Sequence, residues 1–286
     1  MSFIGKLKRE LIVFFSKTCV KSASNDYLGL DLKYPIIYGM GRGYVNPAEI
    51  WMGQCLDAFL RSKQGCVIDV GVNVGVYLVK LKVLRDDIDY IGFEPNAVCN
   101  FYTNELIRLN NFKKARVLPV ALSNELSVRT LYAKKLGDKT ASILADETGD
   151  STNFGHSSDI ITVEGDAFIE MLGVKQIAVI KVDVEGAELF VLNGLVKTIR
   201  KLRPFLYIEV WASKKDLPGV DRVTQIYNLI TELDYSIVSV TFEQELKVVK
   251  SPDDFFKQYD PNYMFIPNEL FDVFVKNIGL VSDVKR

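Results

Sequence analysis

Histidine and closely spaced cysteines are the scarcest chemical groups in this sequence of 286 residues. It contains 1 histidine and 4 cysteines, and no two of the cysteines form a Cys-x-x-Cys pair. A zinc centre needs several such ligands at short spacing, so the sequence argues against a Cys/His zinc site. Reduced thiols in a cytosolic protein are the expected state of Cys19, Cys55, Cys66 and Cys99.

An excess of positive charge is also missing. The chain has 35 Lys and Arg against 36 Asp and Glu, which gives a formal net charge of −1. Proteins that gather nucleic acid or anionic membranes do so through a positive field, and no basic patch stands out in the sequence. We therefore expect no nucleic-acid partner, because such a partner would need a local patch.

Long apolar runs are absent from the N-terminal part. In KLKRELIVFF, the run from Leu11 to Phe15 is too short for the core of a signal peptide and far too short to cross a bilayer. The sequence therefore predicts a cytoplasmic protein that is not exported. An amphipathic helix in residues 1–20 that lies on a membrane, and so gives peripheral contact, is the alternative for this segment.

From residue 66 onward, apolar β-rich runs alternate with segments of helical periodicity. This alternation is typical of a parallel sheet with crossover helices. We therefore predict an α/β fold with a seven-stranded, Rossmann-like, doubly wound sheet. The seven predicted strands are residues 66–70, 90–94, 115–122, 177–184, 204–210, 235–241 and 262–267.

Two regions differ from this pattern. Residues 1–65 read as helical or irregular and predict an N-terminal helical extension to a domain formed by residues 66–286. Residues 134–159 are the most polar long stretch of the chain. A polar segment of that length inside a compact domain predicts a lid or a substrate-binding loop.

The first predicted strand ends in a glycine-rich turn, VIDVGVNVGVYLVKL at residues 67–81. In doubly wound sheets this turn forms the floor of a ligand site at the carboxyl ends of the strands. Gly71 lets a ligand approach the main chain, and Gly75 permits close packing of helix on strand. Asn73 and Val76 stand where a dinucleotide-binding turn has small residues. The turn therefore favours a ligand without a pyrophosphate, and S-adenosylmethionine is the candidate.

Two acids accompany the turn. Asp69 precedes it and can face a cation, while N–H groups at the start of the following helix can hold a carboxylate. Glu94, in GFEPN at the end of the second strand, is placed to accept hydrogen bonds from both hydroxyls of a ribose. The structural alternatives are that Asp69 caps a helix and that Glu94 is an ordinary strand end.

The fourth predicted strand continues into VIKVDVEGAELFVLNG and carries charges where a buried parallel strand is normally apolar. Lys181, Asp183 and Glu185 alternate with apolar residues, so the period of two places them on one face. Charges at this costly position favour a functional role. The structural alternatives are an ion pair for Lys181 and Asp183, and a favourable interaction with the helix dipole for Glu188.

The segments VIDVGVNVGVY, GFEPN, VALSN, IKVDVEGAELFVLNG and PFLYIEVW together resemble the FkbM-type methyltransferases, class I enzymes that use S-adenosylmethionine. The resemblance covers about residues 45–267. It implies a seven-stranded sheet whose last strand is antiparallel, and methyl transfer usually to a hydroxyl of a sugar or polyketide-like natural product. The sequence departs from the family at GVNVG, where alanine often follows the first glycine.

The resemblance also implies roles for individual residues. The turn would hold the methionine part of the cofactor, Glu94 the ribose, and residues after the second and third strands the adenine. Asp183 is predicted both to bind the cofactor and to take part in catalysis. The predicted cofactor-binding residues are Asp69, Gly71, Asn73, Gly75, Glu94, Pro95, Ala121, Leu122 and Asp183.

Methyl transfer to a hydroxyl needs a group that takes the hydroxyl proton. The candidates are Asp183, Glu185 and His156, the last in the polar loop. The expected acceptor is a hydroxyl of a sugar, glycan or small molecule. A divalent ion held by Asp183, Glu185 and Glu209 is an alternative that is not favoured. Two other function classes stay open: a non-catalytic S-adenosylmethionine-binding or interaction module, and a nicotinamide-dependent oxidoreductase.

Overall fold

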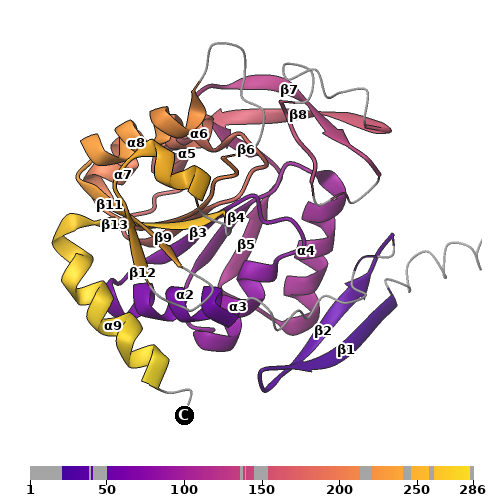
Figure 1. The fold of residues 1–286 in the computed structure, drawn as a ribbon. Helices are drawn as coiled ribbons and strands as arrows, with labels where there is room; N and C mark the ends of the chain where they lie inside the picture. The colour runs from indigo at the N-terminus through magenta and orange to yellow at the C-terminus, as the bar shows by residue number, and fades with distance from the viewer. Residues whose placement is uncertain are drawn as a thin grey trace, which may run out of the picture.

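A central eight-stranded sheet organises the molecule (Figure 1). The computed structural model describes residues 21–38, 40, 50–135, 138, 140–144, 154–212, 221–240, 246–257 and 261–283. The strand order is β12-β11-β13-β10-β9-β3-β4-β5. The strands are β3 (Cys66–Val70), β4 (Tyr90–Phe93), β5 (Ala115–Leu118), β9 (Ile177–Val182), β10 (Phe205–Glu209), β11 (Tyr235–Val240), β12 (Leu246–Val249) and β13 (Asn262–Pro267).

The predicted Rossmann-like sheet is confirmed, with one addition. Strands β3, β4, β5, β9 and β10 are parallel to their neighbours in this group, whereas β13 pairs antiparallel with both β10 and β11. The last strand is therefore antiparallel, as expected. An eighth strand, β12, extends the edge beyond β11 and was not predicted from the sequence.

Helices cover both faces of the sheet. One hydrophobic cluster joins the sheet to α5 (Gly165–Met171), α6 (Glu188–Gly194), α7 (Val196–Leu202) and α8 (Arg222–Glu232). A second cluster joins the opposite face to α2 (Ile50–Ser62), α3 (Val76–Leu84), α4 (Ala97–Asn110) and α9 (Phe271–Asp283). All six residues of β9 are buried, as a central parallel strand requires.

The N-terminal extension is not simply helical, which corrects the sequence prediction. Its described part contains a β-hairpin, β1 (Lys21–Tyr27) and β2 (Leu30–Ile36), and then helix α2. Leu28 and Gly29 form the two-residue turn with positive φ angles of 52° and 87°, the backbone that tight hairpins need. Leu32 is fully buried in the second hydrophobic cluster.

The polar region predicted as a lid is partly strand. A small second sheet has the order β6-β8-β7 and consists of β6 (Ala121–Ser123), β7 (Ser127–Ala133) and β8 (His156–Glu164). The predicted strand 115–122 is thus divided between β5 of the main sheet and β6 of the small one. Residues 156–159 of the predicted loop belong to β8. The small sheet lies at the top of Figure 1, above the central sheet.

Across the described residues, no helix has the length and apolar character needed to cross a membrane. The predicted membrane-contacting segment, residues 1–20, lies outside the described residues.

Candidate functional site

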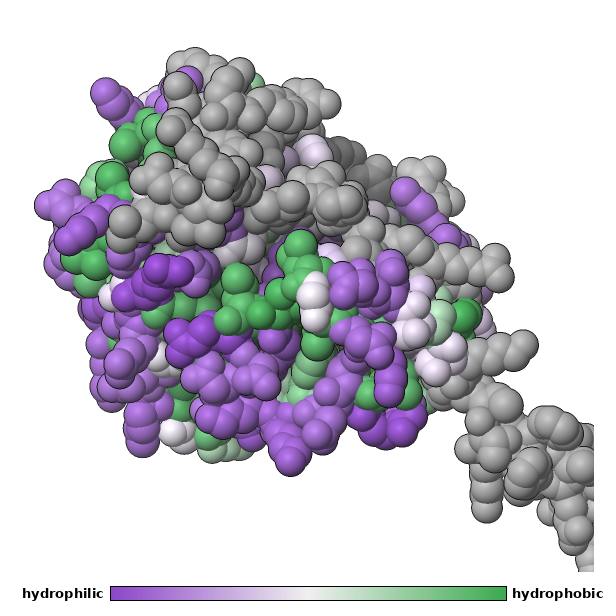
Figure 2. Space-filling model, turned by 90° about the horizontal axis from the view of Figure 1, so that it is seen from below, coloured by the Kyte–Doolittle hydropathy of each residue, from purple (hydrophilic) through white to green (hydrophobic). Residues whose placement is uncertain are grey.

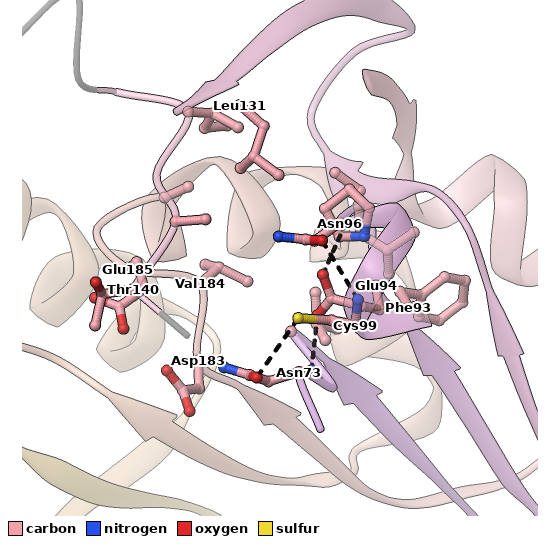
Figure 3. A pocket seen from close by; sticks show the side chains of 18 of the residues that line it. Asn73, Phe93, Glu94, Asn96, Cys99, Leu131, Thr140, Asp183, Val184 and Glu185 are labelled. Atoms are coloured by element: carbon pink, nitrogen blue, oxygen red, sulfur yellow. Dashed lines mark hydrogen bonds between the residues drawn. The ribbon is translucent and has the colours of Figure 1, made fainter. Parts of the chain in front are cut away.

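A cavity of about 270 Å³ opens at the carboxyl ends of β3, β4 and β9, beneath the loop that follows β7. Figure 3 shows Glu94 and Asn96 on one side of it and Asp183 and Glu185 on the other. The residues that line it are Val70, Gly71, Asn73, Phe93, Glu94, Pro95, Asn96, Cys99, Ala121, Leu122, Leu131, Asp138, Thr140, Ala141, Ile143, Asp183, Val184, Glu185, Ala187 and Glu209.

The glycine turn forms the floor of this cavity, and its backbone adopts positive φ angles at three positions. Gly71 has a φ of 83°, Asn73 of 54° and Gly75 of 81°. A Cβ atom on Gly71 would overlap the carbonyl oxygen of Asp183. Gly71 is therefore required for two reasons: its backbone angle, and the close approach of β3 to the end of β9.

Replacing Gly71 with alanine is expected to destabilise the protein more than the same change at Gly173. Gly173 also has a positive φ, 69°, but a Cβ atom there meets nothing within 4 Å. Both alanines carry left-handed strain of about 1–2 kcal/mol, and only Gly71→Ala must also displace the main chain at Asp183. We expect a total loss of about 3 kcal/mol for Gly71→Ala, measured by urea unfolding. Equal losses in the two variants would contradict the close approach.

Glu94 connects the turn to the start of α4. Its carboxylate accepts hydrogen bonds from the backbone N–H of Asn73 at 2.7 Å and of Asn96 at 2.8 Å. Asn96 in turn caps α4, because its side chain accepts from Val98 and Cys99. Burial raises the pKa of Glu94 to about 7, against the lowering effect of the two N–H donors. One buried carboxylate thus orders both loops and still lines the cavity.

A buried lysine lies under the turn. The Lys181 Nζ donates to the carbonyl oxygen of Gly71 at 2.9 Å and pairs with Asp69 at 3.3 Å and with Asp183 at 3.2 Å. Asp69 is fully buried and also accepts a hydrogen bond from the Tyr90 hydroxyl at 2.5 Å. Burial lowers the pKa of Lys181, but the two carboxylates outweigh it, so the pKa lies above its usual value. Lys181 therefore fixes both the turn and Asp183.

Three carboxylates gather on the opposite side of the cavity. Side-chain oxygens of Asp183, Glu185 and Glu209 all lie within 4.8 Å of one another. Burial and the neighbouring Asp183 carboxylate raise the pKa of Glu209 to about 8. Glu185 holds a φ of 57°, a conformation that is uncommon outside glycine and asparagine. The oxygen ligands of this cluster are of the kind that binds a divalent cation.

Glu188 has a structural role, which it fulfils through an ion pair with Arg222. Its carboxylate is buried, pairs with Arg222 at 2.7 Å and accepts the N–H of Gly186 at 2.8 Å. Arg222 also donates to the carbonyl oxygen of Trp211 at 2.6 Å. Glu188 thus joins the turn after β9 to the start of α8, and it does not line the cavity.

The structure brings most of the predicted site residues together. Asp69 and Gly75 do not line the cavity: Asp69 lies beneath the turn, and Gly75 begins α3. His156 is exposed at the start of β8, where it pairs with Ala133, and it is not among the cavity-lining residues. The predicted residues that line the cavity are Gly71, Asn73, Glu94, Pro95, Ala121, Leu122, Asp183 and Glu185.

Several lining residues were not singled out in the sequence. The cap position of Asn96, directly before an apolar helix, was a usable signal. Glu209 was considered only as a metal ligand. Asp138 and Thr140, which line the cavity, lie in residues 134–159, the stretch that the sequence predicts as a lid or a substrate-binding loop. Leu131 lies in β7 and had no sequence signal, because the small sheet was not predicted.

The cavity fits the predicted cofactor. Each carboxylate oxygen of Glu94 can accept more than the one hydrogen bond described above, so the carboxylate can still accept from ribose hydroxyls. Phe93, Ala121 and Leu122 supply apolar surface beside it for a planar base. The carboxylates on the other side suit a positively charged sulfonium.

Comparisons with known proteins give a consistent family. The family model "Methyltransferase FkbM domain" matches residues 69–237. The chain is 24% identical to Methyltransferase sdnD of Sordaria araneosa over 204 residues, which are 62% of this chain and 78% of that protein. It is 26% identical to Methyltransferase 1 of Beauveria bassiana over 199 residues, 60% of this chain and 79% of that protein.

Among solved structures, the FkbM methyltransferase of Methylobacillus flagellatus is similar, with a TM-score of 0.45 and 18% identity. That match covers 71% of this chain and 43% of the other, so the chain spans less than half the length of that protein. The family model matches more than half of the present chain. The protein therefore belongs to the FkbM methyltransferase family, and S-adenosylmethionine is its cofactor.

Proposed function

We propose that the protein transfers a methyl group from S-adenosylmethionine to a hydroxyl oxygen of a sugar, a glycan or a related natural product. One observation supports this above the others: a single cavity has Glu94 on one side and three carboxylates on the other. The first group binds the donor. The second can receive the proton that a hydroxyl must lose when its oxygen attacks carbon.

In this proposal each side chain has a defined task. The cofactor supplies a methyl group on a positively charged sulfur. Glu94 holds the ribose, and Lys181 fixes the turn and Asp183. The acceptor hydroxyl lies against the carboxylate cluster, and its oxygen attacks on the side opposite the sulfur. A carbon–oxygen bond forms, the carbon–sulfur bond breaks, and the hydroxyl proton passes to a carboxylate.

Asp183, Glu185 and Glu209 take the base role because they line the cavity, whereas His156 does not. Lys181 fixes the position of Asp183, since its cation lies 3.2 Å from that carboxylate. Glu209 holds a proton more strongly than an ordinary glutamate. The proposal does not require a bound metal ion, because the carboxylates themselves can take the hydroxyl proton.

The test uses the full chain with methyl-labelled S-adenosylmethionine. Pools of sugars, glycans and small natural products are incubated with the protein, and labelled products are analysed for the atom that carries the methyl group. The proposal predicts a label on oxygen in a hydroxyl-bearing acceptor. A label on nitrogen or carbon would contradict it, and a labelled product from nucleic acid alone would also contradict it.

Glu94→Gln is expected to weaken binding of the cofactor product, S-adenosylhomocysteine. Charge-assisted hydrogen bonds contribute about 1.5–3 kcal/mol, so the affinity should fall by about one to two powers of ten. Calorimetric titration measures the change. Glu232→Gln, at an exposed position at the end of α8, is the matched control and should bind normally. If Glu94→Gln and the native protein bound S-adenosylhomocysteine with equal affinity, Glu94 would not be a ribose-binding residue.

The raised pKa of Glu94 adds a pH dependence to the same experiment. Ribose hydroxyls are held best by the ionised carboxylate, so affinity should increase as pH rises through about 7. The contribution of Glu94 to the stability of the fold changes with pH in the opposite direction. The folded state keeps the proton between the usual value of 4.5 and about 7, so this contribution to stability falls as pH rises across that window. Both trends should disappear in Glu94→Gln.

A further inference from the structure

A large groove lies at the edge of the central sheet opposite the cofactor cavity. It occupies about 1140 Å³ where strands β3, β4, β5 and β9 begin. Its walls come from four stretches of chain that are far apart in the sequence, residues 60–66, 85–91, 113–116 and 172–176. Parallel strands bring their amino ends to one edge, so these four stretches meet there.

The groove is strongly basic. Two acids, Asp87 and Asp89, lie among its lining residues. Seven basic residues also line it, so the lining has a net charge of +5. The whole chain has a net charge of −1, and the rest of the protein therefore carries −6. The seven basic lining residues are Arg61, Lys63, Arg85, Lys113, Lys114, Arg116 and Lys175.

Local structure explains only part of this charge. Arg61 pairs with Asp57 at 2.7 Å, and Arg85 with Asp87 at 3.0 Å. Cations near helix C-termini also offset the helix dipole. Three exposed cations, Lys113, Arg116 and Lys175, make neither an ion pair nor a side-chain hydrogen bond with any described residue. Lys114 donates a hydrogen bond to the carbonyl oxygen of Asp87 at 2.8 Å.

Apolar side chains lie between these cations. Ile88, Leu172 and Val174 are partly exposed in the lining. Tyr90, the one aromatic residue among the described residues of the lining, is buried, so it offers no surface on which a nucleic-acid base could stack. The face seen from below in Figure 2, on the side of α2 and α3 in Figure 1, carries hydrophobic side chains between hydrophilic ones.

We propose that this groove binds an acidic peptide segment of a partner protein, with carboxylates on the cations and apolar side chains on Ile88, Leu172 and Val174. Charge complementarity fixes the sign of the ligand. The positive charge is confined to the groove, and this limits the length of the ligand. A long nucleic acid or an anionic bilayer would reach beyond the groove to the rest of the protein, which carries a net charge of −6, whereas a short segment remains within the positive field.

The proposal is tested by anisotropy with a fluorescein-labelled peptide of repeating Glu-Glu-Leu units. The groove variant combines Lys113→Glu, Arg116→Glu and Lys175→Glu, three exposed cations that make no ion pair or side-chain hydrogen bond with any described residue. The native protein should bind the peptide, and the groove variant should bind it about tenfold or more weakly. Added salt should weaken native binding, and a Gln-Gln-Leu peptide should not bind.

A matched variant carries the same change of charge elsewhere. It combines Lys247→Glu, Lys250→Glu and Lys276→Glu, three exposed residues outside the groove, and it should bind the peptide normally. Binding of S-adenosylhomocysteine verifies that both variants fold. The proposal is overturned if the native protein does not bind the peptide or if the groove variant binds it unchanged. It is also overturned if a single-stranded oligonucleotide or phosphatidylserine vesicles bind the groove more tightly than the peptide does.

Discussion

Asp183→Asn is expected to slow methyl transfer by about 10²–10⁴-fold, the usual contribution of a positioned proton acceptor. Asparagine keeps the shape of the side chain but cannot take up a proton or act as the anion of the cluster. Glu209→Gln should have a loss of the same kind, because its oxygens lie within 4.8 Å of those of Asp183. Initial rates are measured with the acceptor identified by the labelling experiment.

The controls separate chemistry from binding and folding. S-adenosylhomocysteine should bind Glu209→Gln as it binds the native protein, because Glu209 is outside the ribose-binding side. Asp159→Asn changes an exposed carboxylate of β8 that does not line the cavity, and it should retain full rate. His156→Ala should also retain it. A full rate in Asp183→Asn together with a large loss in His156→Ala would transfer the base role to the histidine.

Lys181→Met is expected to lower the free energy of unfolding by about 3–5 kcal/mol, because removing one member of a buried ion pair leaves the other charge uncompensated. Asp69 and Asp183 both lose their partner, and the larger cost comes from Asp69, whose side chain is fully buried, whereas that of Asp183 is partly exposed. The carbonyl oxygen of Gly71 loses its donor as well. Cofactor binding should therefore weaken in parallel with stability, and urea unfolding and calorimetry measure the two effects.

A double variant distinguishes this cause from a simple loss of packing. Asp69→Asn combined with Lys181→Met removes both charges, so it should recover part of the lost stability. Lys201→Met, at an exposed position of α7, should change stability by less than about 0.5 kcal/mol. If the double variant were no more stable than Lys181→Met alone, the buried charge of Asp69 would not be the source of the loss.

The main sheet was predictable because its strands carry strong and local signals. The β9 sequence, Ile177–Val182, is buried throughout and is apolar apart from Lys181. Such strands alternate with helical segments along the chain. The hairpin of β1 and β2 lacked such a signal, since KSASNDY is mostly polar and its turn is Leu28-Gly29 instead of the common Asn-Gly. The small sheet was missed because β7 and β8 are joined by a polar segment of more than twenty residues.

The meeting of Gly71, Asn73 and Glu94 at one cavity was predictable from local sequence, because they lie on consecutive strand ends. The opposite side of the cavity depends on contacts over long distances in the chain. Glu209 reaches Asp183 only because β10 pairs with β9 in register. The basic groove was hidden for the same reason. Residues 113–116, KKAR, supply three of its seven cations, and only the fold brings the other four to them from three distant stretches.

The hairpin of β1 and β2 sets a limit on how far the protein can be shortened for crystallisation. Asn110, the last residue of α4, exchanges two hydrogen bonds with the main chain of Lys33, at 2.6 Å and 2.8 Å. The Tyr27 hydroxyl accepts a hydrogen bond from Lys80 of α3 at 3.2 Å. A version that began after residue 36 would expose the apolar surface that Leu32 covers. A shortened protein should therefore begin no later than Lys21.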